Sequence, residues 1–98
     1  MKMEQIKATV YTVVNDIPKG YVLTYGIVAA LAGIPNYVRI VARLMSQSDH
    51  PLNNHRVVNS VGRTAPGWDD QRKMLEAEGV TFKPNGNVDL KRHLWRPT

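Results

Sequence analysis

The chain has 98 residues, of which 43% are hydrophobic, enough for one small core in a single domain spanning residues 1–98. It contains no cysteine, which excludes disulfides, thiolate metal sites and thiol catalysis and suits a cytoplasmic protein, associated with the nucleoid if the source is bacterial. The formal net charge of +5 favours nucleic acid as a partner, and no apolar run is long enough to predict a membrane span.

The N-terminal third of the sequence predicts two helices. Apolar residues recur at helical spacing and predict an amphipathic helix over residues 3–15, which the breakers of Ile17-Pro18-Lys19-Gly20 end. Residues 21–23 form a short apolar link or strand. Thr24 stands at the N-cap position of a second helix, and Gly33 ends that helix.

A third helix is predicted over residues 35–46, with Pro35 in its first turn. Only about three residues separate it from the second helix, which is the length of a helix-turn-helix corner. The predicted core face consists of Val38, Val41, Ala42 and Met45. The predicted DNA-contacting stripe consists of Asn36, Arg39 and Arg43, with Tyr37 beside them. A solvated basic helix without a DNA partner is the alternative.

Beyond a mostly irregular segment, residues 46–68, the sequence predicts a fourth helix over residues 69–78. The apolar stretches 80–82 and 88–90 flank an Asn-Gly turn and predict a β-hairpin. The fold class is therefore predicted to be mainly α with a small β-hairpin, a winged helix-turn-helix DNA-binding domain. We expect the basic tail to dock Trp95 on the core, with phosphate contacts as the alternative.

The ordered motifs resemble a known family. Tyr25-Gly26-x-Val28-Ala29-Ala30-Leu31-Ala32-Gly33, then Arg39, then His55-Arg56-Val57-Val58-Asn59-Ser60-x-Gly62, resemble the C-terminal domain of O6-alkylguanine-DNA alkyltransferases over residues 5–80. In those enzymes the residue before the motif's histidine is the reactive cysteine. Here it is Asn54, whose amide is not a nucleophile at neutral pH. With this replacement, the chain is similar to the alkyltransferase-like proteins, which bind alkylated DNA without repairing it.

The resemblance implies that the protein approaches duplex DNA from the minor groove and rotates the damaged guanine into a pocket. Tyr25 would crowd the 3′ phosphate, and Arg39 would enter the duplex and fill the vacated space. An inserted guanidinium can stack and hydrogen-bond, which offsets part of the few kcal/mol that flipping costs. A buried hydroxyl at Tyr25 and a surface ion pair at Arg39 are the structural alternatives.

The resemblance also implies a lesion pocket. Met45 and Val57 match its lining positions, although Met45 also fits the core face of the third helix. The covering loop runs from Arg63 to Trp68, and either Arg63 or Arg72 is expected to sense the guanine. Asn54, where relatives often carry tryptophan, offers an amide donor that can reach the guanine O6 or N7.

Two further motif residues, His55 and Glu78, match the base and the orienting carboxylate of the enzymes. Such a pair has no nucleophile to activate here, so we expect it to tie the motif to the fourth helix instead. A second departure is Asn53, where the family usually has proline. The segment between Arg39 and His55 is also about two residues shorter than in the active enzymes, which alters the pocket rim.

The sequence therefore predicts a non-enzymatic, monomeric sensor of O6-alkylguanine that signals to nucleotide excision repair and needs no cofactor or metal. A winged-helix regulator that reads sequence in the major groove is the alternative. A metal-dependent nuclease built on His50, Asn54 and His55 is a third hypothesis, with Asp49 as its one nearby carboxylate.

Overall fold

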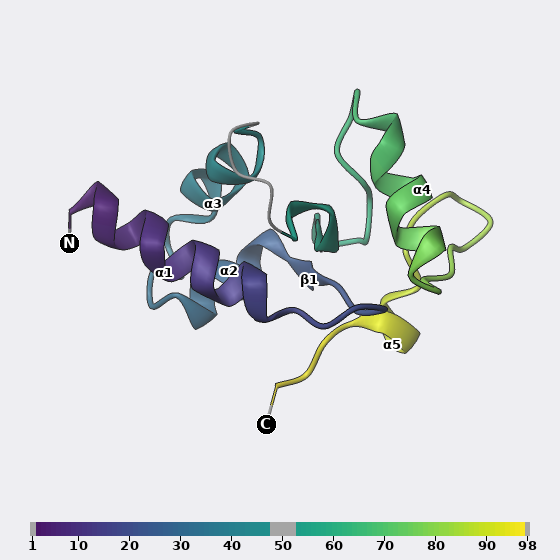
Figure 1. Cartoon of the computed structure of the whole chain (residues 1–98), viewed down its shortest axis with the longest axis horizontal. Coiled ribbons are helices and arrows are strands. Elements are labelled where there is room, and N and C mark those ends of the chain that lie inside the picture. Colours follow the sequence, from purple (N-terminus) through teal and green to yellow (C-terminus); the bar gives the residue numbers. More distant parts are fainter. Residues whose placement is uncertain (1, 48–52, 98) are drawn as a thin grey trace.

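The computed structural model describes residues 2–47 and 53–97, and it is mainly helical (Figure 1). Three helices occupy the N-terminal half, and a short motif segment leads to a fourth helix and a final helical turn. In chain order the elements are α1 (Met3–Asp16), β1 (Leu23–Thr24), α2 (Tyr25–Leu31), α3 (Val38–Met45), the 3₁₀ turn η1 (Asn54–Arg56), β2 (Val57–Val58), α4 (Asp69–Ala77) and α5 (Leu90–His93).

The first two helices form as the sequence predicts. α1 ends at Asp16, ahead of the Ile17-Pro18 breaker, and α2 begins directly after β1. The Thr24 side chain accepts a hydrogen bond of 3.2 Å from the backbone N–H of Ile27, so the predicted N-cap is confirmed. α1, α2 and α3 enclose the main apolar core, against which Trp95 of the C-terminal segment also packs.

The third helix begins later than predicted. Residues 34–37 form a turn in which the N–H of Tyr37 donates to the Ile34 carbonyl, and α3 starts only at Val38. Helical side chains tilt toward the N-terminus, so Val38 lies over the corner and is 38% exposed. The prediction that Val38 faces the core is therefore wrong. The buried face of α3 consists of Val41, Leu44 and Met45, and Ala42 is half-buried.

A two-stranded parallel sheet joins the start of the helix-turn-helix to the motif segment. β1 pairs with β2 in the register Leu23↔Val57 and Thr24↔Val58. A short strand is one of two interpretations of residues 21–23, and the observed strand is Leu23–Thr24. Its partner strand lies more than thirty residues away along the sequence. This pairing holds η1 beside the helices that the sequence assigns to DNA binding.

The predicted hairpin is a turn with one antiparallel bridge, Phe82↔Val88, rather than two strands. The ladder does not extend because the Val88 N–H donates to the Gly62 carbonyl instead, at 2.9 Å. Residues 90–93 form α5, so the second predicted strand is wrong beyond Val88. The fold class, mainly helical with a small sheet, is confirmed.

The C-terminal segment returns to the middle of the molecule. The Trp95 N–H donates to the Val22 carbonyl, and the Val22 N–H donates to the His93 carbonyl. His93 also binds across chain segments, from Nδ1 to the Gly20 carbonyl and from Nε2 to Thr81. The predicted docking of Trp95 is confirmed. No helix in the described part of the chain is long and apolar enough to cross a membrane.

Candidate nucleic-acid interface

The predicted DNA-contacting residues lie together at the α2–α3 corner and along α3. All are exposed, and within residues 2–47 and 53–97 none of these side chains has a hydrogen-bonding or ionic partner. They are Asn36, Tyr37, Arg39 and Arg43. Tyr37 is 56% exposed, and the apolar side chains of Leu31 and Val38 are exposed at the same corner. The surface therefore combines unpaired cations with apolar contact area, a composition suited to a DNA groove.

Tyr25 is the first residue of α2 and packs partly against the main core. Its burial raises the pKa of the phenol, so the hydroxyl is protonated at neutral pH. A half-buried ring with a neutral hydroxyl gives a rigid projection, rather than a mobile one, at the start of the helix-turn-helix. The half-burial of Tyr25 is compatible both with a phosphate contact and with the structural alternative of a buried hydroxyl.

The residues assigned to the pocket lie at the junction of α3, η1 and β2. Met45 and Val57 belong to the main core cluster, with exposed fractions of 7% and 1%. Asn54 is also buried, at 7%, and its Nδ2 donates to the Met45 carbonyl at 3.2 Å. The amide donor that the sequence analysis directs at guanine is thus engaged within the protein. The Oδ1 of Asn54 has no hydrogen-bonding partner in the described structure.

The preceding residue, Asn53, ties this junction to α1. Its Nδ2 lies 3.1 Å from the Asn15 carbonyl and 3.5 Å from the Val14 carbonyl. Proline has no side-chain donor for such bonds. The departure from the family's proline therefore adds an anchor between η1 and the C-terminal end of α1.

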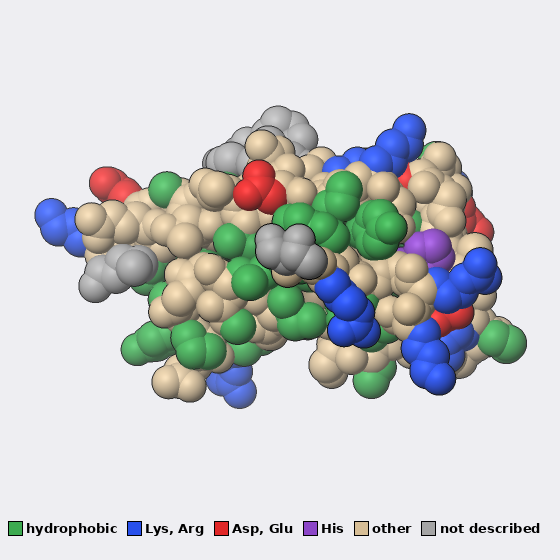
Figure 2. All heavy atoms as spheres, turned by 90° about the horizontal axis from the view of Figure 1, so that it is seen from below, with side chains coloured by type: hydrophobic (Ala, Val, Ile, Leu, Met, Phe, Trp, Pro, Cys, Tyr) green, Lys and Arg blue, Asp and Glu red, His purple; other side chains and the backbone are tan. Residues whose placement is uncertain are grey.

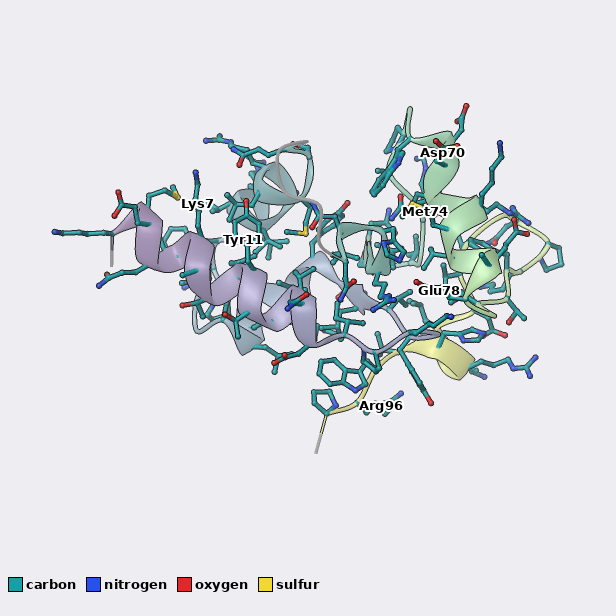
Figure 3. The ribbon with its side chains drawn as sticks, in the orientation of Figure 1. Lys7, Tyr11, Asp70, Met74, Glu78 and Arg96 are labelled. Carbon is teal, nitrogen blue, oxygen red and sulfur yellow. The ribbon has the colours of Figure 1, made fainter. Side chains whose placement is uncertain are left out.

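The predicted structural pair is part of a cluster of His55, Arg56 and Glu78, and Figure 3 labels Glu78 at the end of α4. His55 Nε2 lies 2.9 Å from Glu78 Oε2, and Arg56 donates to both carboxylate oxygens, from Nε at 2.9 Å and from Nη2 at 2.7 Å. Arg56 Nη1 also donates to the Ile17 carbonyl. The hydrogen bonds from Arg56, followed by those from His55, lower the pKa of Glu78 from 4.5 to about 2 despite its burial. The cluster joins α1, η1 and α4.

Gln71 is a buried polar residue whose role the sequence analysis did not identify. It is fully buried on α4, and its Nε2 donates to the carbonyls of His55 and Val57 at 3.1 and 3.0 Å. Its Oε1 accepts from the Ala65 N–H. Gln71 therefore holds the loop 63–68 against η1 and β2. No local pattern marks it, because a glutamine within a helix ordinarily faces solvent.

The loop between β2 and α4 is shaped by Asn59. Its Oδ1 accepts from the N–H groups of Val61 and Arg63, at 3.0 and 2.8 Å, around Gly62 with φ +88°. Asn59 stands three residues before Gly62, and asparagine and glycine in one short segment predict a turn from the sequence. The turn fixes the backbone of Arg63 and leaves its side chain exposed, and Trp68 at the loop's end is half-buried.

Arg72, the other basic residue considered for guanine sensing, lies in the first half of α4, and its side chain contacts residues further along the chain. Its guanidinium carbon lies 4.4 Å from the centroid of the Phe82 ring, and its Nε lies 3.5 Å from Glu76. Arg63 has no such partner within the described residues. The geometry therefore favours Arg63 for a contact with a bound base.

A second basic area lies on a different face. Figure 2 shows Lys and Arg side chains gathered at the α5 end, where Lys91 and Arg92 are exposed. In Figure 1, α5 lies at the lower right of the molecule and α3 at the upper left, so this basic area is separate from the stripe on α3. Basic charge is thus not confined to one surface, and the +5 net charge alone does not locate the interface.

Metal chemistry finds no support in the described residues, where no three His, Asp or Glu side chains cluster to hold an ion. His55 is committed to Glu78 and Asn54 to Met45. His50 and Asp49, the other members of the nuclease hypothesis, lie outside the described residues.

Comparison with known proteins agrees with this geometry. Residues 5–80 match the family model for the DNA-binding domain of 6-O-methylguanine DNA methyltransferase. The DNA base-flipping protein of Escherichia coli K12 is 41% identical over 101 residues, covering 96% of this chain and 77% of that protein. Alkyltransferase-like protein 1 of Schizosaccharomyces pombe is 34% identical over 109 residues, covering 99% of this chain and all of that protein.

Solved structures show the same relationship. The crystal structure of S. pombe Atl1 with damaged DNA containing O6-carboxymethylguanine matches with a TM-score of 0.87 at 33% identity, covering 99% of this chain and 100% of that one. The O6-methylguanine methyltransferase of Mycobacterium tuberculosis matches with a TM-score of 0.65 at 25% identity, covering 80% of this chain and 49% of that one.

Proposed function

Since this chain belongs to the 6-O-methylguanine DNA methyltransferase DNA-binding family, as an alkyltransferase-like protein, we propose that it binds O6-alkylguanine in duplex DNA and flips the damaged base without dealkylating it. The observation that carries the proposal is Asn54. It precedes the His55-Arg56 motif, is buried where the fold matches a relative bound to damaged DNA, and stands in a chain without cysteine. A carboxamide in that position cannot accept an alkyl group as a thiolate does.

The α2–α3 corner and α3 are proposed to meet the DNA in the minor groove. The unpaired side chains of Arg39 and Arg43 supply charge, and Tyr37 supplies apolar contact area. Arg39 is proposed to enter the base stack and Tyr25 to press on the 3′ phosphate of the flipped nucleotide. The neutral, half-buried phenol of Tyr25 supports this role, because a rigid neutral group can approach a phosphate without a desolvated charge.

The flipped base is proposed to lie against Met45, Asn54 and Val57, with Arg63 and Trp68 at the rim. Met45 and Val57 belong to the main core cluster, so core and pocket would share one apolar layer. Arg63 is proposed as the basic residue that senses the guanine, because its backbone is fixed by Asn59 and its side chain is exposed.

A protein that holds a lesion without removing it must pass the DNA to another repair system. We propose nucleotide excision repair proteins as that partner, and a monomer as the form that binds DNA. The missing chemistry supports the proposal, because excision of the nucleotide removes an alkylated base without transferring its alkyl group to a protein. Duplex DNA containing alkylguanine is the primary ligand.

A binding titration tests the proposal. Two duplexes identical except for O6-methylguanine or guanine at one position are titrated with the protein at one stated salt concentration. The lesion should be bound at least about fivefold more tightly, because a weakly paired base costs less to flip. Equal affinities would reject lesion recognition. A footprint confined to one sequence on undamaged DNA would favour the winged-helix regulator instead.

A further inference from the structure

Two polar atoms on consecutive residues of η1 are buried and have no hydrogen-bonding partner within the described structure. They are the Oδ1 of Asn54 and the Nδ1 of His55, on side chains that are 7% and 6% exposed. Buried polar atoms in proteins are nearly always paired. Two unpaired atoms side by side in the sequence therefore indicate a place where a ligand supplies the missing groups.

Both atoms are hydrogen-bond acceptors. The Nδ2 of Asn54 donates to the Met45 carbonyl, which orients the amide and leaves Oδ1 as the free atom. If the Asn54 amide were turned over, its Oδ1 would face the Met45 carbonyl oxygen, and two acceptors would lie against each other. His55 Nε2 donates to the Glu78 carboxylate over 2.9 Å, and in the tautomer that carries its proton on Nε2 the ring presents a lone pair at Nδ1.

Loose packing does not explain the unpaired atoms. Gln71, the neighbouring buried amide, makes three hydrogen bonds, to the backbones of His55, Val57 and Ala65. Arg56, beside the same histidine, donates to three acceptors. The fold gives each of these groups three hydrogen bonds and leaves two atoms open, one of them on Asn54, which is placed at the lesion, and the other on the next residue.

We propose that Asn54 Oδ1, with His55 Nδ1 beside it, selects O6-substituents that end in a hydrogen-bond donor over apolar substituents of the same size. The inference rests on the proposed function and names the lesion class that this pocket prefers: hydroxyalkyl adducts of guanine. A terminal hydroxyl can donate to Oδ1. A terminal methyl group would cover the acceptor and leave it unpaired, which is the costly outcome for a buried polar group.

The test compares three duplexes that differ at one base: O6-(2-hydroxyethyl)guanine, O6-propylguanine and guanine. The two adducts have equal numbers of heavy atoms and differ in a hydroxyl against a methyl. The full chain should bind the hydroxyethyl duplex between about twofold and tenfold more tightly than the propyl duplex, the range of one net hydrogen bond. Asn54→Leu, which keeps the side-chain size without the acceptor, should abolish or reverse this preference.

Asn53→Leu is the matched control, because it makes the same change one residue earlier, where the amide faces the carbonyls of Asn15 and Val14. It should keep the hydroxyethyl preference even if it lowers stability. If Asn54→Leu does not fold, Asn54→Ala removes the same acceptor with less bulk, and the comparison of adducts on the unaltered chain is decisive by itself.

The outcomes separate the inference from the proposed function. Equal or tighter binding of the propyl duplex by the unaltered chain overturns the inference, and so does a hydroxyethyl preference that survives in the Asn54 variants. In either case tighter binding of both adducts than of guanine leaves the proposed function standing. Failure to distinguish either adduct from guanine rejects both.

Discussion

Replacing Glu78 with glutamine tests whether the His55–Arg56–Glu78 cluster holds the motif segment in place. The pKa of Glu78 falls from 4.5 to about 2, which corresponds to at most about 3.5 kcal/mol, since one pKa unit is roughly 1.4 kcal/mol. The side chain is 13% exposed, so solvent screening reduces this to about 2 kcal/mol. For a domain of this size the melting temperature should fall by roughly 10 °C.

The pH dependence identifies the charge as the cause. A carboxyl group whose pKa is lower in the folded state stabilises the fold fully above its unfolded pKa and loses that contribution as pH falls through the folded pKa. The stability difference between the unaltered chain and Glu78→Gln should therefore be complete at pH 6. Roughly half of it should be lost near pH 3 to 3.5, and nearly all of it below pH 2.

Urea unfolding followed by circular dichroism at pH 6 and pH 3.3 measures both effects. Glu76→Gln is the matched control, because Glu76 lies two residues earlier, in the last turn of α4, but is half-exposed and pairs only with Arg72 among the described residues. It should change stability by less than about 0.5 kcal/mol. A Glu78→Gln effect no larger than that of the control, or one that is equal at both pH values, would refute the assignment.

Two further substitutions test the loop and the interface. Gly62→Ala should lower the free energy of unfolding in urea by more than about 2 kcal/mol, because the residue has φ +88° and a Cβ would lie 2.6 Å from the Val88 carbonyl oxygen. The control Gly67→Ala, with φ +81° and open space around it, should lower it by only about 1 kcal/mol. Comparable losses would show that the close approach to Val88 is unimportant. Arg39→Ala should weaken binding to the O6-methylguanine duplex by at least about tenfold while stability changes by less than about 0.5 kcal/mol. Arg96→Ala removes the same charge from the C-terminal segment and should bind nearly normally; equal losses in the two variants would reduce Arg39 to a general electrostatic role.

Local patterns were sufficient for α1, α2 and α4. The Thr24 cap, the Ile17-Pro18 breaker and the spacing of apolar residues place α1, α2 and α4 within one or two residues of their ends. α3 begins three residues late because the turn at Ile34 and Tyr37 depends on packing against α2. That shift exposes Val38 and buries Leu44 in its place.

Contacts between distant segments account for what the sequence did not predict. The parallel pairing of Leu23 with Val57, and the bond from Val88 to the Gly62 carbonyl that interrupts the hairpin, join residues more than twenty positions apart. Periodicity and turn chemistry carry no information about such partners. The same limit applies to Gln71, whose polar character gives no sign of complete burial.

Sequence reasoning named the residues of the candidate site but not the orientation of their atoms, and the binding roles of these residues stay predictions. The exposure of Arg39 and Arg43 on α3 and the contact between His55 and Glu78 agree with the sequence analysis. The hydrogen bonds from Arg56 to both Glu78 and the Ile17 carbonyl were not predicted. The orientation of Asn54 is the most consequential addition. Its donor is used by Met45, so the atom left for a ligand is an acceptor.

The central claim is that this chain recognises an alkylated base and leaves it unrepaired. One measurement addresses both parts: stoichiometric protein is incubated with a duplex carrying O6-methylguanine, the affinity is compared with that for the guanine duplex, and the masses of protein and DNA are then determined. The account predicts tighter binding to the lesion, an unchanged protein mass and an intact methylated base. Equal affinity for the two duplexes, or loss of the methyl group from the DNA, would contradict it.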